Sequence, residues 1–205
     1  MLCVLKSAHE LSRLERSGRL LHTRFHDQIF ALAADDLGDS LRYVTPSAAA
    51  AKGFTSPESA WTQIQKNLTA RAPTLEVFGL APFWFVDCPG WPPSAFLNWR
   101  GLHTWGQQVL KTNHPLMAAS FSSDQLILGL ANSGEFHNRL SHARQAPVER
   151  PLLSLPFLLN ANALPTPIAK IDLVFGAHVT LTPHKAPEKS ISFTLIEATS
   201  PTSST

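Results

Sequence analysis

Residues 56–86, SPESAWTQIQKNLTARAPTLEVFGLAPFWFV, place a capped helix directly before two β-type segments. The helix begins at Ser56-Pro57-Glu58, because serine suits the N-cap and proline suits the first helical position. Apolar residues at helical spacing then predict a single helix over 57–70. Strands are expected over 74–79 and 83–86, where aromatic and β-branched residues gather. A helix followed by neighbouring strands indicates an α+β fold.

The rest of the chain continues this mixture. Cap, proline and glycine signals predict further helices at 7–18, 46–53, 98–111 and 135–145. Apolar runs bounded by turn residues predict strands at 20–25, 28–33, 40–44, 95–97, 116–121, 125–131, 168–175, 178–182 and 190–196. The first three form a meander, and 116–131 form a hairpin. The expected fold is α+β, with a mixed or antiparallel sheet, peripheral helices and a strand-rich C-terminal extension.

Composition favours a packed globule. The chain has 205 residues, of which 44% are hydrophobic and 16% are charged. A chain of this length buries roughly 70% of its unfolded surface, so it needs no metal or disulfide for stability. The formal charge of +2 comes without a cluster of Lys and Arg. The charge pattern therefore argues against nucleic-acid binding, which depends on many phosphate contacts in one place.

Cysteine use and the N-terminal residues predict a cytoplasmic, soluble protein. Cys3 and Cys88 lack the spacing of a metal or redox motif and are expected to be idle thiols in a reducing compartment. Residues 1–6 lack the basic and apolar regions of a signal peptide. No window holds 18 consecutive apolar residues, so no membrane association is expected.

Five short segments together resemble a known family. They are 43–46 (YVTP), 53–55 (GFT), 67–68 (NL), 96–97 (FL) with Trp105, and 117–128 (MAASFSSDQLIL). Their order is similar to that of DUF1444, the YtpQ-like family of uncharacterised bacterial proteins, over roughly residues 20–145. Family members usually carry an Arg-Asp pair at the hairpin, where this chain has Ser123-Asp124. The resemblance implies a fold and no known activity.

The resemblance also suggests how the chain is divided. Residues 1–146 form the expected α+β domain similar to DUF1444. The composition changes at the four prolines from Pro151 to Pro167. Residues 147–198 are therefore expected to form a strand-rich extension packed on that domain. The Ser/Thr/Pro-rich residues 199–205 are expected to be a disordered tail.

Nine histidines raise the question of a metal site. His22 and His26 share strand parity and are expected to face one side, with Asp27 adjacent. A protein metal site needs three or more converging ligands, and no local Cys/His cluster supplies them. His137 and His142 are five residues apart and lie off a common helix face. The sequence therefore predicts no metal and no cofactor.

One pattern points to catalysis. His178-Val179-Thr180 looks like one half of the paired His-x-Thr strands of two-histidine phosphoesterases, in which two imidazoles act as acid and base. The second half is missing, because His103-Thr104-Trp105 and His22-Thr23-Arg24 lie at the wrong spacing. An ordinary edge-strand histidine is the competing interpretation. His178 is the one catalytic candidate.

Aromatic residues are concentrated between Phe78 and Trp105. One interpretation is a central strand at Trp84 that is covered on both faces. The other is that Trp91, on a proline-rich loop, and Trp99, at a helix start, are exposed and contact a partner, because tryptophan dominates many interfaces. The candidate binding residues are Trp84, Trp91 and Trp99.

Two functions remain. The favoured one is a non-catalytic binding or adaptor protein of the bacterial cytosol, of immunity type or accessory to a secretion system, with another protein as its partner. It contacts that partner through the segment around Trp91 or through an edge strand of the C-terminal section. The alternative is a hydrolase or phosphoesterase whose site is assembled from dispersed His and Asp residues, including His178. Whether the protein is an enzyme is left open, with the non-catalytic function favoured.

Overall fold

The computed structural model describes residues 1–38, 40–145, 152, 155–174, 178–184 and 191–194. Helices and antiparallel sheets occur in similar amounts, which confirms the α+β class. The helical elements are α1 (Ala8–Leu14), η1 (Glu15–Ser17), α2 (Pro46–Ala51), α3 (Pro57–Arg71), η2 (Ala72–Thr74), η3 (Pro93–Asn98), α4 (Leu102–Val109) and α5 (Gly134–Gln145). No helix in these ranges is both long and apolar enough to cross a membrane.

The first sheet has four strands, which are β1 (Leu2–Ser7), β2 (His22–His26), β3 (Ile29–Asp36) and β4 (Leu41–Tyr43). β3 is central and pairs antiparallel with all the others. β2 and β4 lie end to end along one edge of β3, and a backbone hydrogen bond from the Leu21 N–H to the Val44 carbonyl joins them. The expected meander is therefore wrong in one respect, because β1 occupies the other edge of β3.

The second sheet has eight strands in the order β12-β11-β10-β9-β7-β8-β6-β5. Their bounds are β5 (Glu76–Leu80), β6 (Phe83–Asp87), β7 (Leu116–Ala119), β8 (Leu126–Leu130), β9 (Phe157–Leu158), β10 (Thr166–Val174), β11 (His178–Pro183) and β12 (Ile191–Thr194). The strands after residue 147 thus continue the sheet that β5–β8 begin. The predicted boundary near 147 and the predicted tail 199–205 both lie outside the described residues.

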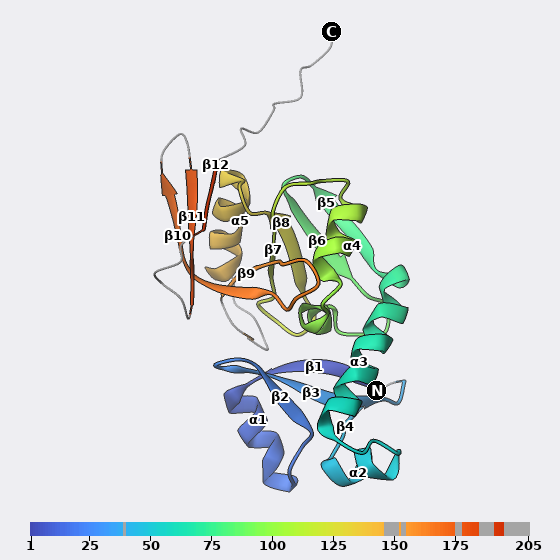
Figure 1. The fold of residues 1–205 in the computed structure, drawn as a ribbon. Coiled ribbons are helices and arrows are strands. Elements are labelled where there is room, and N and C mark those ends of the chain that lie inside the picture. The colour runs from blue at the N-terminus through green and yellow to red at the C-terminus, as the bar shows by residue number, and fades with distance from the viewer. Residues whose placement is uncertain (39, 146–151, 153–154, 175–177, 185–190, 195–205) are drawn as a thin grey trace.

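One hydrophobic core joins the two sheets. It contains Cys3 and Leu5 from β1, Ile64 and Leu68 from α3, and Phe96 from η3. In Figure 1, α3 runs from the lower sheet to the upper one, and the core lies where these elements meet. The predicted helix at 57–70 is confirmed, with Ser56 as its N-cap and its apolar face buried.

A second core surrounds α5. Phe136 and Leu140 of this helix pack against Met117 and Ile127 of the sheet on one side and against Val179 of β11 on the other. Figure 1 shows α5 standing between β10–β12 and β7–β8, so the eight-stranded sheet curls around the helix. One face of β7 and β8 is therefore fully covered.

Residues 93–111 differ from the prediction. Residues 95–97 were expected to be extended, and they form part of the 3-10 helix η3, in which Pro93 occupies an early position. Proline's fixed φ is suited to a first helical turn. The helix predicted over 98–111 is shorter, because α4 begins only after Gly101 and ends at Val109.

Candidate binding surface on the β5–β6 hairpin

Three large apolar side chains are exposed together on the β5–β6 hairpin. Phe78 is 51% exposed, Leu80 80% and Phe85 43%. The strand register pairs Phe78 with Phe85 and Leu80 with Phe83. Directly paired residues of antiparallel strands share one face of a sheet. Phe78, Leu80 and Phe85 therefore form one continuous surface, which we call the hairpin face.

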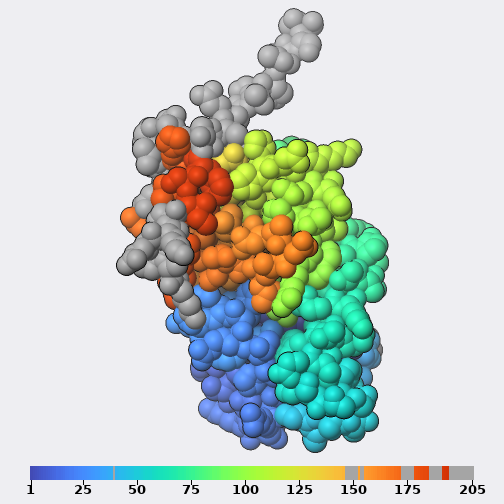
Figure 2. Space-filling model, viewed as in Figure 1, coloured from blue at the N-terminus to red at the C-terminus, as the bar shows by residue number. Residues whose placement is uncertain are grey.

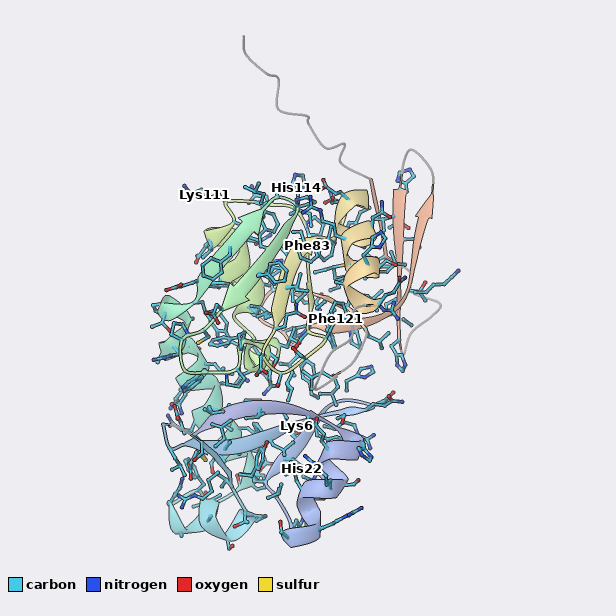
Figure 3. The ribbon with its side chains drawn as sticks, turned by 180° about the vertical axis from the view of Figure 1, so that it is seen from behind. Lys6, His22, Phe83, Lys111, His114 and Phe121 are labelled. Carbon is cyan, nitrogen blue, oxygen red and sulfur yellow. The ribbon has the colours of Figure 1, made fainter. Side chains whose placement is uncertain are left out.

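The hairpin face is exposed because α5 stops short of it. Phe83 belongs to the α5 core, and its ring lies 5.8 Å from that of Phe136. Phe85 contacts Phe83 at 5.3 Å between ring centroids and continues the apolar surface outward. Figure 3 labels Phe83, which lies between the hairpin strands and α5. On this face of the sheet, no helix of the described residues covers the strands beyond Phe83.

β5 is also an edge of the eight-stranded sheet. It pairs with β6 alone among the described strands, so one row of its backbone groups faces away from the sheet. Gly79 has a φ of +110°, and a Cβ there would lie 2.8 Å from the carbonyl oxygen of Phe83. Only glycine fits this position. An edge strand with free backbone groups is a template for pairing with another chain.

The three tryptophans predicted to bind a partner lie in three different settings. Trp84 is half-buried on the opposite face from Phe85 and packs against the main core. Trp91 is half-buried on its loop, with the Arg71 guanidinium 5.7 Å from the ring centroid. Arg71 also donates to the carbonyl of Pro89, which anchors the loop to α3.

Trp99 is a core residue, so the interpretation in which it is exposed is wrong. Its side chain is 7% exposed, and its indole N–H donates to Thr69 Oγ1 at 3.0 Å. Phe96 packs edge-on against its ring. A Cβ at Gly101 would overlap that ring, so Gly101 lets the chain pass close beside it. The helix expected to begin near Trp99 starts later, at Leu102.

A large hollow of the described surface lies elsewhere. It is a cleft of about 1040 Å³ between α3, the η3–α4 junction and the β9–β10 loop. Trp61, Lys66 and Arg100 line it, together with one edge of Trp99. Figure 2 shows the surfaces of α3 and of the β9–β10 segment meeting in this region. No sequence pattern predicts this cleft, because its walls come from segments far apart in the chain.

The structure separates the histidines that the sequence grouped. A β-bulge lies between Arg24 and His26 in β2, so the strand's alternation is broken. His22 pairs with Leu32 and lies 3.4 Å from Glu15, whereas His26 pairs with Ile29 of the main core. The expectation that His22 and His26 share a face is wrong for this reason.

His178 is exposed at the start of β11, where it pairs with Thr194 of β12. The described residues contain one group of three histidine and acidic side chains with converging donor atoms, and it consists of His26, Asp27 and His184. His178 lies outside that group, at the opposite end of β11 from His184. No local motif in the sequence connects His184 to residues 26 and 27.

Neither cysteine is a candidate nucleophile. Both thiols are free and buried. Burial raises the pKa of the Cys3 thiol to about 12, against the opposing effect of the Asn98 side chain, whose amide lies 3.7 Å from the sulfur. A thiol with such a pKa is protonated and unreactive at neutral pH.

The strand register and the exposed fractions of Phe78, Leu80 and Phe85 make the hairpin face a continuous exposed apolar surface. It lies within the aromatic segment that the sequence singled out, but its members are phenylalanine and leucine rather than tryptophan. Comparison of this chain with protein-family models, curated proteins and solved structures found no match.

Proposed function

We propose that this protein is a non-catalytic binding or adaptor protein that contacts another protein through the hairpin face, Phe78, Leu80 and Phe85. The observation that carries the proposal is the exposure of these three side chains on one face of an edge hairpin. Isolated exposed apolar residues are common on protein surfaces, whereas adjoining ones mark interaction sites.

The edge position of β5 indicates how the partner binds. A partner strand that pairs with β5 extends the eight-stranded sheet through backbone hydrogen bonds. Its apolar side chains on one face then cover Phe78 and Leu80, and Phe85 lies one strand further in. Backbone pairing supplies affinity in this mode, and the side-chain contacts supply selectivity.

A location in the bacterial cytosol is part of the proposal. The free, buried thiols of Cys3 and Cys88 support a reducing compartment, in which cysteines remain unpaired. An immunity-type or secretion-accessory role is a subclass of the same proposal, and both roles consist of binding another protein.

The alternative of a hydrolase built on His178 has less support. A two-histidine mechanism needs a second imidazole across the scissile bond from the first. His178 is exposed and does not belong to the group of His26, Asp27 and His184. The adaptor function is therefore the one that the arrangement of the described residues favours.

A photo-crosslinking amino acid placed at position 80 tests the proposal in living host cells. We expect a discrete covalent adduct with one other protein, because the side chain at this position points outward at the sheet edge. The matched control places the same crosslinker at Leu37, which is also exposed but lies in the loop between β3 and β4. Position 37 should give no such adduct.

A second variant identifies the surface by loss of binding. Phe78→Ser should lower the affinity for the captured partner at least tenfold, while Leu37→Ser leaves it unchanged. Equal binding by both variants would remove the hairpin face from the proposal. An adduct with twice the mass of this chain would also overturn it, because the partner would then be a second copy rather than a different protein.

A further inference from the structure

His26, Asp27 and His184 bring three metal-ligand types to one place. One donor atom from each residue lies within 4.8 Å of the donor atoms of the other two. The imidazole rings of His26 and His184 are 4.8 Å apart between centroids, and His184 Nδ1 lies 3.6 Å from Asp27 Oδ2. Ligands of a tetrahedral zinc ion are about 3.4 Å apart at the usual bond lengths. Small side-chain rotations therefore suffice to close the group around an ion.

The backbone holds this group from both sides. His26 ends β2, and Asp27 lies in the two-residue turn before β3. This turn is fixed by a hydrogen bond from the Ala8 N–H to the Gln28 carbonyl at 2.9 Å. His184 follows β11, and its N–H donates to the Pro167 carbonyl at 3.0 Å. Both segments are thus anchored independently of any ion.

The ring of His26 is held in a fixed orientation as well. It is buried and packs edge-on against Phe157 of β9, with the ring planes at 88°. The bulge in β2 is what turns His26 toward this ring and away from the face of His22. Asp27 is half-buried and His184 is exposed, so an ion can reach the group from solvent.

We propose that His26, Asp27 and His184 bind a divalent transition-metal ion, with Zn²⁺ as the best match. Two imidazole nitrogens and one carboxylate suit Zn²⁺ and its neighbours in the first row, whereas Mg²⁺ and Ca²⁺ prefer oxygen ligands alone. Three protein ligands leave a further coordination position for water. The proposal is independent of the hairpin face.

The position of the ion gives it a structural consequence. His26 ends a strand of the four-stranded sheet and Asp27 follows it, whereas His184 follows a strand of the eight-stranded sheet. Figure 1 shows the β2–β3 turn beneath the lower ends of β10 and β11. A bound ion would link the two sheets at the edge of their shared core.

Calorimetric titration of the full chain with Zn²⁺ tests the site. We expect one ion per chain in the unchanged protein. His184→Ala should weaken binding at least tenfold without unfolding the protein, since the side chain is exposed. His178→Ala is the matched control, because it removes an exposed histidine from the other end of the same strand and should leave the affinity unchanged.

Thermal unfolding gives a second measurement. Zn²⁺ should raise the melting temperature of the unchanged protein and of His178→Ala, but not that of Asp27→Asn or His184→Ala, because only a ligand that binds the folded state stabilises it. Equal Zn²⁺ affinity in His184→Ala and the unchanged protein would overturn the proposal. An equal loss in His178→Ala and His184→Ala would overturn it too, since binding would then reflect surface histidines in general.

Discussion

At the scale of single residues, His137 links stability to pH. It is buried at the start of α5, and its Nε2 lies 2.7 Å from the Ala131 carbonyl, to which it donates. Burial lowers the pKa of His137, and this effect outweighs the hydrogen bond to Ala131, which raises it. The folded protein therefore keeps this imidazole neutral at a pH where the unfolded chain already binds a proton.

The free energy of unfolding should consequently fall as pH drops below about 6.5, the ordinary pKa of histidine. The loss from this one group is at most about 1.4 kcal/mol per pH unit and ends below the folded pKa. His137→Gln should flatten the dependence, as measured by urea unfolding between pH 5 and 8. His142→Gln, on the exposed side of the same helix, should keep the slope of the unchanged protein. A slope that His137→Gln leaves intact would assign the acid sensitivity to other groups.

Residue types and spacing predicted the burial and the facing of side chains only where the backbone is regular. The capped start of α3 and its buried face follow from Ser56, Pro57 and the apolar spacing, and all are confirmed. The bulge before His26 has no residue signature, so strand parity gave the wrong face for that side chain. Trp99 was misplaced because its burial depends on Thr69 and Phe96, which approach it only in the folded chain.

At the scale of elements, Gly129 allows α5 to pack on β8. A Cβ at this position would overlap the ring of Phe136, the buried aromatic residue in the first turn of α5. Gly129→Ala should therefore lower the free energy of unfolding by about 1–3 kcal/mol, the usual cost of overpacking a core. Chemical denaturation measures it.

Gly134→Ala is the control for this variant, because a Cβ there meets nothing within 4 Å although Gly134 begins the same helix. It should change stability by less than about 0.5 kcal/mol. Similar losses in the two variants would mean that glycine matters here for backbone freedom rather than for the approach of Phe136.

Elements with local signals were predicted, and those without were missed. α1 has a capping box between Ser7 and Glu10, which is confirmed. β1 was overlooked because both of its faces are buried, so Leu2–Ser7 shows no alternation of apolar and polar residues. β9 was overlooked because two residues, Phe157 and Leu158, are too few for any periodic pattern.

At the scale of the whole molecule, the shared core predicts that both sheets unfold together. Phe96 of η3 is fully buried in this core between β1 and the second sheet. Phe96→Ala should lower the free energy of unfolding by about 3–5 kcal/mol. Far-ultraviolet circular dichroism and tryptophan fluorescence should still report a single coincident transition.

Phe78→Ala is the matched comparison, because Phe78 is a half-exposed phenylalanine outside both cores. It should cost much less stability. Two separate transitions in the unchanged protein would show that the sheets are independent folding units in spite of their common core.

The pairing order of the strands lay beyond what sequence patterns predict. The α+β class followed from alternating helical and β-type segments, and it is confirmed. β9 joins β7 to β10 and so makes one sheet out of two groups of strands. Its pairing with β7 depends on contacts between residues about forty positions apart, for which residue spacing carries no signal. The same holds for the approach of His184 to His26 and Asp27.

The burial of β1 on both faces has a consequence for folding during synthesis. β1 finds its strand partner as soon as β3 has left the ribosome, since the two pair over Leu2–Ser7. Part of its cover comes much later, because Asn98, whose amide approaches the sulfur of Cys3, is 95 residues further along the chain. The nascent chain therefore carries an apolar strand without its final cover while those residues are being made, and in this interval a chaperone at the ribosome would find its binding site in Leu2–Leu5.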